Sequence, residues 1–364
     1  MLGREALRAL KSQRKAQKFK AMINEKELYL ITDEKQRLYY TGYQSTDGYL
    51  LLGRGFSYFV IDSRYFHAAN KLLSKKGVNV ILGSGYSALK DIMYKTGCDT
   101  LGIDFTKTSL HEYKIFEEAG YKLKDISKEI ADAMRVKSPA DLRKIKKACK
   151  IAQTALKQLL PEIKEGVRER ELAASLEYKM KMLGASGPSF ETIVAFGANA
   201  AIPHHVTGEA ILKKNMPVLI DFGCVYQGYC SDMTRTFFYG KPDKEFTRCY
   251  NAVLKAHEEA AKNITDGTDC AVADSYARKV LEDAGIQDHF THSLGHGIGV
   301  YIHESPALSP RGQGELKNSM VFSIEPGVYF DDKFGIRIED TVTLENGKVK
   351  SLMTYTKKLV KLKQ

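Results

Sequence analysis

The segment VLIDFGCVYQGYCSDMTRT, residues 218–236, contains two apolar runs with an aspartate inside the first, Asp221, and another at the start of the second, Asp232. Each run has the composition of a buried β-strand. An ionised carboxylate in a buried strand costs several kcal/mol unless a cation or hydrogen bonds compensate it. Two such carboxylates on adjacent antiparallel strands repel each other, so the sequence predicts a positive group between Asp221 and Asp232.

A second pair of acidic motifs lies nearer the C-terminus. FSIEPG, residues 322–327, ends one predicted strand with Glu325, and IRIED, residues 336–340, carries Glu339 along another. Strand alternation puts Arg337 and Glu339 on one face. The segment between the two acidic pairs holds four of the nine histidines, His289, His292, His296 and His303. Four carboxylates and an imidazole exceed the needs of one structural salt bridge and suit two divalent metal ions.

The chain has 364 residues, which is enough for two domains with separate cores. Ser138-Pro139-Ala140-Asp141 predicts a helix start, because the serine hydroxyl can cap free backbone NH groups, proline suits the first helical position, and the aspartate lies in the first turn. Apolar residues then recur every three or four positions up to Leu159. We therefore expect one domain over residues 1–137 and a second over residues 138–364.

The two domains differ in their predicted elements. Strands are expected in the first at residues 48–52, 56–61, 78–82 and 100–105, alternating with helical patterns. This arrangement predicts a small α/β domain that contains a hairpin. In the second, helices are expected near residues 139–160, 169–183, 243–263 and 269–284. Strands are expected there at residues 190–196, 217–222, 233–239, 320–324 and 336–344. Helices grouped around hairpins predict an α+β domain.

The net charge of +11 is concentrated at the two ends of the chain. Residues 1–20 contribute +6 and residues 356–364 contribute +4, so the interior is close to neutral. We interpret the basic ends as solvated rather than as arms for nucleic acid or membrane, and we expect neither partner. The first twenty residues contain no signal-peptide core, and no apolar run approaches membrane-spanning length, so a soluble, unexported protein is expected.

The six cysteines form no CxxC pair and have no regular spacing, which excludes a disulfide framework and a zinc finger. Cys224 and Cys230 lie close to the acidic motifs, but we interpret them as packing residues. Cysteine usage therefore favours a reducing, cytoplasmic location.

Five short motifs carry their ligand-type residues in the order Asp, Asp, His, Glu, Glu. They are DFG at 221–223, SDMTRT at 231–236, GHGIGVYIHE at 295–304, IEPG at 324–327 and RIEDT at 337–341, preceded by IPHH at 202–205. Together they resemble metallopeptidase family M24, which implies a pita-bread catalytic domain, and within it the branch of Xaa-Pro aminopeptidases and prolidases. YTGY at 40–43 and IDSRY at 61–65 are similar to the creatinase-type amino-terminal domain of that branch. The resemblance thus covers nearly the whole chain.

This resemblance implies a centre of two divalent metal ions. Asp221 would bind one ion, and Asp232 and Glu339 would bridge both. His296 and Glu325 would complete the second site. Hard carboxylates with a single imidazole suit Mn²⁺, with Co²⁺ or Zn²⁺ as alternatives.

Catalytic roles also follow from the resemblance. A pair of divalent ions makes water a nucleophile at neutral pH and polarises the scissile carbonyl. Glu325 would pass a proton toward the leaving nitrogen, while His303 and His204 would steady the tetrahedral intermediate and the substrate. Arg337, beside Glu339, would hold a bridging carboxylate or the substrate by a charge-assisted hydrogen bond.

The expected reaction is hydrolysis of the bond between an N-terminal residue and a following proline. The pyrrolidine ring fixes φ and removes the amide NH, so ordinary peptidases position this bond poorly and a dedicated site is useful. Ala307 stands where some prolidases carry an arginine that receives the dipeptide carboxylate. We therefore favour an Xaa-Pro aminopeptidase acting on peptides of three or more residues, with an Xaa-Pro dipeptidase (prolidase) as the alternative.

Three other classes are less favoured. A methionine aminopeptidase shares the fold and the ligand types, but the extra domain of residues 1–137 and the short separation of Glu325 from Glu339 disfavour it. A creatinase-like hydrolase needs no metal, and a non-catalytic pita-bread binding module loses its ligands, whereas all five ligands are present here. The resemblance also implies a homodimer.

Overall fold

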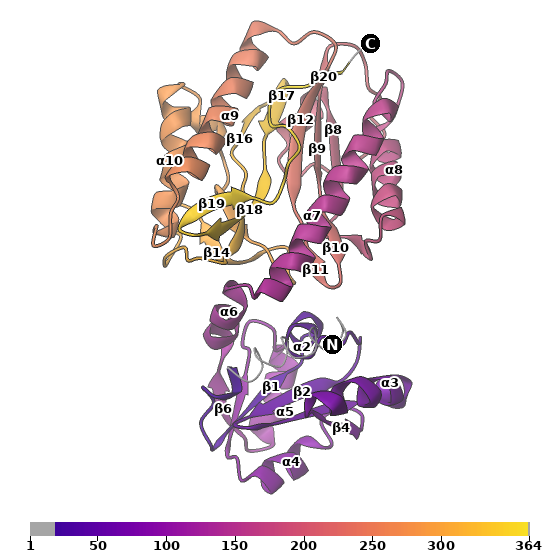
Figure 1. Ribbon diagram of the computed structural model, residues 1–364, viewed down its shortest axis with the longest axis vertical. Coiled ribbons are helices and arrows are strands. Elements are labelled where there is room, and N and C mark those ends of the chain that lie inside the picture. Colours follow the sequence, from indigo (N-terminus) through magenta and orange to yellow (C-terminus); the bar gives the residue numbers. More distant parts are fainter. Residues whose placement is uncertain (1–18, 363–364) are drawn as a thin grey trace, which may run out of the picture. The chain divides into compact units, whose positions relative to one another are not determined.

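The computed structural model describes residues 19–362. The chain divides into two compact units, Met1–Met134 and Arg135–Gln364 (Figure 1). The basic segment 1–20, which the sequence analysis interprets as solvated, lies outside the described residues except for its last two.

A six-stranded sheet with the order β4-β3-β2-β1-β5-β6 forms the centre of the first unit. Its strands are β1 (Glu27–Ile31), β2 (Tyr49–Gly53), β3 (Phe56–Ile61), β4 (Asn79–Leu82), β5 (Thr100–Ile103) and β6 (Lys122–Asp125). The helices are α2 (Glu34–Thr41), α3 (Ser63–Leu73), α4 (Leu89–Thr96), α5 (Leu110–Glu118) and α6 (Ser127–Arg135). The antiparallel pairing of β2 with β3 confirms the predicted hairpin, in whose turn Gly55 adopts a φ of +85° that favours glycine.

The pairing of the other strands makes this sheet mixed. β1 pairs antiparallel with β2, whereas β4, β5 and β6 each join a neighbour in parallel. Leu28, Leu51 and Val60 are buried between the sheet and its helices. The expected α/β organisation is confirmed, although the sequence analysis missed β1 and β6.

Four long helices belong to the second unit: α7 (Pro139–Leu159), α8 (Glu169–Met182), α9 (Lys244–Asn263) and α10 (Cys270–Asp283). The predicted start of α7 is confirmed, because the hydroxyl of Ser138 accepts the Asp141 NH and the Asp141 carboxylate accepts the Ser138 NH. The side chains of Asp243 and Asp269 accept backbone NH groups at the starts of α9 and α10, without the reciprocal bond seen at α7. The strands lie between the pair α7 and α8 and the pair α9 and α10 (Figure 1).

The described strands of the second unit form four sheets, with the orders β20-β12-β9-β8, β14-β13-β15-β18-β19, β11-β10-β7 and β16-β17. The first half contributes β7 (Gly187–Pro188), β8 (Ile193–Phe196), β9 (Met216–Phe222), β10 (Cys224–Tyr226), β11 (Tyr229–Cys230) and β12 (Met233–Tyr239). The second half contributes β13 (Gly295–Gly297), β14 (Glu304–Leu308), β15 (Val321–Ile324), β16 (Gly327–Phe330), β17 (Phe334–Arg337), β18 (Asp340–Glu345), β19 (Lys348–Ser351) and β20 (Lys361–Leu362). Helices around largely antiparallel strands make this unit α+β, as expected.

The acidic residues lie at the ends of strands. Asp221 is the penultimate residue of β9, and Asp232 directly precedes β12, which pairs antiparallel with β9. Glu325 directly follows β15, and Glu339 directly precedes β18, its antiparallel partner. The single strand predicted over residues 336–344 is therefore wrong: β17 pairs with β16 and β18 with β15, and the chain passes from one sheet to the other at residues 338–339.

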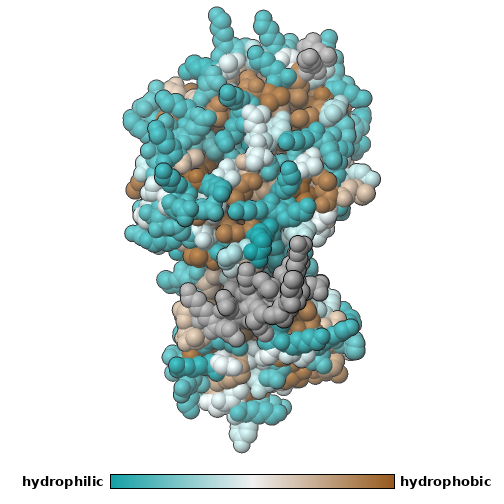
Figure 2. Space-filling model, viewed as in Figure 1, coloured by the Kyte–Doolittle hydropathy of each residue, from teal (hydrophilic) through white to brown (hydrophobic). Residues whose placement is uncertain are grey.

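Apolar side chains fill the interior of the second unit, where Phe222, Phe237 and Phe322 are fully buried. Polar residues cover much of the face of this unit that Figure 2 shows. Within residues 19–362, every helix is too short or too polar to cross a bilayer. All six cysteines, including Cys224 and Cys230, are buried and free of disulfide bonds.

Candidate metal centre

Four of the five predicted ligands meet at one point. Asp232, His296 and Glu339 offer ligand atoms that all lie within 4.8 Å of one another. The Nε2 atom of His296 is also 3.3 Å from Oε1 of Glu325 and 3.5 Å from Oδ2 of Asp232. The strand ends of β12, β13, β15 and β18 therefore bring together residues that are up to 107 positions apart in the chain.

Asp221, the fifth predicted ligand, faces the same cluster from β9. Its negative charge raises the pKa of Asp232, Glu325 and Glu339, which places it within electrostatic reach of all three. Its Oδ2 atom accepts a hydrogen bond of 2.6 Å from Nη2 of Arg337. Its Oδ1 atom is buried and has no hydrogen-bond partner among the described residues.

The electrostatics of the cluster favour a bound cation. Burial, reinforced by neighbouring carboxylates, raises the pKa of Asp232 and of Glu339 well above their ordinary values. Burial likewise raises the pKa of Glu325 to about 7 and lowers the pKa of His296, which keeps the imidazole neutral and able to bind a metal. Oε1 of Glu339, like Oδ1 of Asp221, is buried and lacks a hydrogen-bond partner within residues 19–362. Unpaired carboxylate oxygens beside a neutral imidazole fit hard divalent ions.

Arg337 ties two of the candidate ligands to each other. Besides Asp221, it donates from Nε to the hydroxyl of Thr234 over 3.1 Å. That hydroxyl in turn donates to Oε2 of Glu339 over 2.7 Å. Nη1 of Arg337 donates to the Tyr329 hydroxyl at 2.7 Å. The contact with Glu339 that the sequence analysis expected is thus made through Thr234, and the direct contact is with Asp221.

Ser323 orients the second group of ligands. Its hydroxyl donates to Oε1 of Glu325 over 2.9 Å and accepts the backbone NH of His296 over 3.0 Å. One side chain on β15 thereby fixes a carboxylate and the strand that carries the imidazole. Such outer hydrogen bonds set the direction from which a ligand approaches a metal.

His303 and His204 lie at the rim of the cluster, and both are exposed. The ring of His303 packs edge-on against that of His296, with centroids 4.3 Å apart. Nη1 of Arg337 donates to the carbonyl of Pro203 over 3.3 Å, which holds the segment that carries His204 against the centre. His204 lies within electrostatic reach of both Glu325 and His303.

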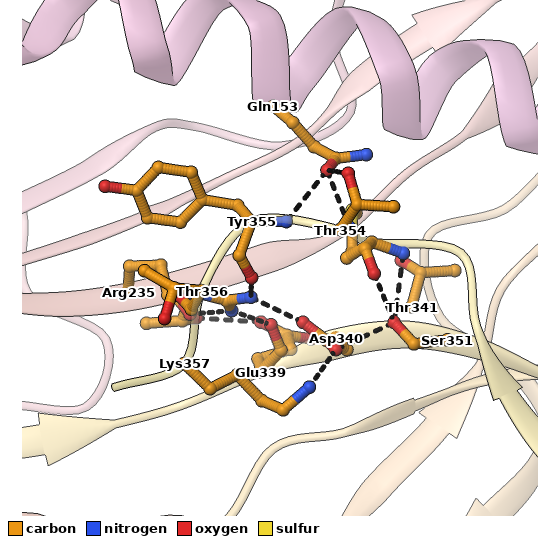
Figure 3. A network of polar contacts seen from close by, with 12 residues as sticks. Gln153, Arg235, Glu339, Asp340, Thr341, Ser351, Thr354, Tyr355, Thr356 and Lys357 are labelled. Carbon is orange, nitrogen blue, oxygen red and sulfur yellow. Dashed lines mark hydrogen bonds and ion pairs between the residues drawn. The ribbon is translucent and has the colours of Figure 1, made fainter. Parts of the chain in front are cut away.

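A buried ion pair supports the backbone of Glu339 (Figure 3). Arg235 donates from Nη1 to the carbonyl oxygens of Thr234 and Glu339, and from Nη2 to Oδ1 of Asp340 over 2.7 Å. Asp340 also accepts hydrogen bonds from Ser351 and from Lys357. Every oxygen of this buried carboxylate is therefore paired, and the start of β18 is held in one register.

The sequence analysis missed three residues that shape the centre, Thr234, Ser323 and Tyr329. Thr234 follows Asp232 by two positions and Ser323 precedes Glu325 by two. Strand alternation places residues two apart on one face, so this spacing could have revealed both hydroxyls. Tyr329 lies on β16, which pairs with β17 as a hairpin that sets Gly327 opposite Arg337, so its contact with Arg337 depends on a hairpin register that the sequence analysis did not predict.

The fold and this donor set define a metallopeptidase. The chain belongs to metallopeptidase family M24, whose pattern matches residues 143–346, and the creatinase/prolidase N-terminal domain matches residues 15–137. The resemblance stated from the motifs is confirmed, as is the expected order of a creatinase-type domain followed by a pita-bread domain.

Similar proteins include peptidases with two related specificities. The Xaa-Pro dipeptidase of Pyrococcus furiosus is 41% identical over 251 residues, which are 68% of this chain and 72% of that protein. The structure of an Xaa-Pro dipeptidase from Bacillus anthracis superimposes with a TM-score of 0.91 at 30% identity, covering 97% of this chain and 100% of that one. An X-Pro aminopeptidase structure from Thermotoga maritima gives a TM-score of 0.87 at 31% identity, covering 94% and 99%.

Proposed function

We propose that this protein is a metal-dependent Xaa-Pro dipeptidase, which hydrolyses the bond between an N-terminal residue and a C-terminal proline. The observation that carries the proposal is the buried cluster of Asp232, His296, Glu325 and Glu339 with Asp221 beside it. The named dipeptidase relatives favour this specificity, which the sequence analysis held as its alternative.

The candidate ligands would hold two divalent ions. Asp221 would bind the first ion, Asp232 and Glu339 would bridge the two, and His296 with Glu325 would bind the second. The bound ions would activate water as the nucleophile and polarise the scissile carbonyl. Mn²⁺ is the expected occupant, with Co²⁺ or Zn²⁺ as alternatives.

Side chains of the centre would position the substrate and move the proton. Glu325 would pass a proton toward the leaving proline nitrogen, the role that the resemblance to the family implies. The exposed imidazoles of His204 and His303 would donate hydrogen bonds to the substrate at the rim. Arg337 would keep Asp221 oriented through their charge-assisted hydrogen bond.

The test is product analysis by mass spectrometry. Metal-stripped protein, with and without Mn²⁺, is incubated with Ala-Pro, Ala-Pro-Ala and Met-Ala-Ala. We expect Mn²⁺-dependent release of alanine from Ala-Pro, and loss of this release in Asp232→Asn. Absence of Ala-Pro cleavage with Mn²⁺, Co²⁺ and Zn²⁺ would overturn the proposal. Cleavage of Ala-Pro-Ala alone would indicate an Xaa-Pro aminopeptidase, and release of methionine would indicate a methionine aminopeptidase.

An Xaa-Pro aminopeptidase is the second candidate, and Ala307 favours it. Ala307 pairs with His296 across β13 and β14, and its side chain is exposed but carries no charge for a dipeptide carboxylate. Under this function, kcat/KM for Ala-Pro-Ala exceeds that for Ala-Pro, and Ala307→Arg shifts the ratio toward the dipeptide. A cytoplasmic location and a homodimer stay predictions.

A further inference from the structure

Glu169, at the first position of α8, is fully buried and accepts four hydrogen bonds from one segment of the chain. Its Oε1 atom accepts from the Phe196 NH over 2.8 Å and from Nδ2 of Asn199 over 2.9 Å. Its Oε2 atom accepts from Nε2 of His205 over 2.9 Å and from the Gly208 NH over 3.1 Å. One carboxylate therefore binds both ends and the middle of the segment 196–208 by hydrogen bonds.

The chemistry of the partners defines the charge state of this anchor. All four are N–H donors, and a carboxylate has about four lone-pair positions to receive them. Glu169 is therefore ionised, and His205 carries a proton on Nε2. The four hydrogen bonds, with the N-terminus of α8, compensate the burial of the charge. A glutamine at position 169 would replace one carboxylate oxygen with an NH₂ group. That group cannot accept hydrogen bonds from the N–H groups of the segment.

The same segment carries His204 to the rim of the metal centre. On its inner side, Arg337 donates to the carbonyl of Pro203. The backbone of Ala200 lies so close to Gly335 that a Cβ atom on that glycine would overlap its carbonyl oxygen. Next to these contacts the segment exposes Ile202 and Val206, which lie two positions before and after His204 and are 54% and 79% exposed. Asn199 and His205, which lie on either side of Ile202 and His204 in the sequence, are both held by Glu169.

We propose that Glu169 is a positioning residue for substrate binding: it acts through the segment 196–208 to hold His204 over the metal centre. The inference rests on the proposed function, because it assumes that His204 contacts the substrate. Within residues 19–362, Glu169 makes no hydrogen bond or ion pair with a candidate metal ligand, so its replacement acts on the position of His204 and leaves the ligand set intact.

The test compares Glu169→Gln with a matched variant of the same helix turn. We expect Glu169→Gln to lower kcat/KM for the better Xaa-Pro substrate about tenfold to a hundredfold, the scale set by a shift of about 1 Å in a reactive group. Mn²⁺ affinity of the metal-stripped protein, measured by calorimetry, should stay within about twofold, because no ligand moves. Glu171→Gln is the control, since Glu171 is exposed and its side chain, among the described residues, pairs with Arg168 at the start of the same helix.

A double-mutant cycle with His204→Ala separates positioning from a general structural role. If Glu169 acts through His204, Glu169→Gln has little further effect on kcat/KM in the His204→Ala background. Equal losses in both backgrounds, or a fall in Mn²⁺ affinity, would overturn the proposal. Should Glu169→Gln fail to fold, Asn199→Ala removes one of the four donors and should give a smaller loss that again depends on His204.

Amide hydrogen exchange provides a readout that does not depend on activity. The NH groups of Phe196 and Gly208 should exchange faster in Glu169→Gln than in the wild type or in Glu171→Gln. If the wild type cleaves no Xaa-Pro peptide, the proposed function fails while this exchange still tests the anchor. Unchanged exchange at both amides would overturn the positioning role, whatever the substrate.

Discussion

Nη2 of Arg337 lies 2.6 Å from Oδ2 of Asp221, and both side chains are largely buried. The two residues are 116 positions apart and come from β17 and β9. Burial acts to lower the pKa of this guanidinium, but the charges of Tyr329 and Asp221 act to raise it. The net pKa is well above the ordinary value. Arg337 is therefore a permanent cation that fixes one oxygen of Asp221, while the other oxygen has no hydrogen-bond partner among the described residues.

Replacement of Arg337 by glutamine should weaken metal binding. The variant loses the charge that orients Asp221, and outer-shell changes of this kind cost about tenfold to a hundredfold in metal affinity or activity. We expect calorimetry with Mn²⁺ to show the loss mainly at one of the two proposed sites, with a parallel fall in kcat/KM. Arg170→Gln, which removes an exposed arginine paired with Glu209, is the control. Two unchanged Mn²⁺ affinities would contradict this role.

Binding of Mn²⁺ should release protons. Burial and mutual repulsion raise the pKa of Asp232, Glu339 and Glu325, so the metal-free centre keeps protons that isolated carboxyl groups would lose. Because Mn²⁺ displaces these protons, its apparent affinity should increase with pH up to about 7, the pKa of Glu325. Calorimetry at pH 6 in two buffers of different ionisation enthalpy measures the protons released. Identical heats in the two buffers would refute the prediction.

The same shift determines how the stability of the metal-free protein depends on pH. A carboxyl group whose pKa is raised by folding contributes stability below its unfolded value, about 4.5 for Glu325, and this contribution is lost as the pH rises through about 7. Glu325→Gln removes one such group. Urea denaturation of metal-free protein at pH 5 and pH 8 should therefore show a smaller decline for Glu325→Gln than for the wild type, and equal declines would speak against the shift.

Gly335→Ala should destabilise the protein and lower its activity. The new Cβ atom would overlap the carbonyl oxygen of Ala200, so β17 and the segment that carries His204 must separate. Overpacking of this kind costs about 1–3 kcal/mol in free energy of unfolding. Gly187→Ala is the matched control, because its Cβ atom would meet open space. Thermal denaturation and kcat/KM for the two variants check the prediction, which fails if both behave alike.

His257 on α9 should make the protein less stable in mild acid. Burial lowers its pKa to about 3, and neither ring nitrogen has a hydrogen-bond partner among the described residues. The unfolded chain takes up a proton near pH 6.5, whereas the folded chain does not, so stability falls as the pH drops from about 6.5 toward 3. His257→Phe removes this dependence. Below pH 6, the difference in free energy of unfolding between the wild type and His257→Phe should change by about 1.4 kcal/mol per pH unit. If the two proteins lose stability in parallel as the pH falls, the prediction is wrong.

Several features of the fold were predictable because their causes are local. The start of α7 depends on Ser138, Pro139 and Asp141, which lie within one turn of one another. β12 has the predicted bounds because its run of strand-forming residues, rich in threonine and aromatic side chains, ends at Gly240 and Pro242. Capping and periodicity act over a few residues, so a single sequence contains the information they need.

The sequence also indicated the five candidate ligands, because four acidic residues stand out beside apolar runs and the resemblance to the family adds His296. It did not indicate their arrangement. The break at residues 338–339, the contact of Arg337 with Asp221, and the anchoring of residues 196–208 by Glu169 join segments whose separation in the chain gives no periodic signal. These contacts depend on strand register and on the packing of one sheet against another, and only the folded chain determines both.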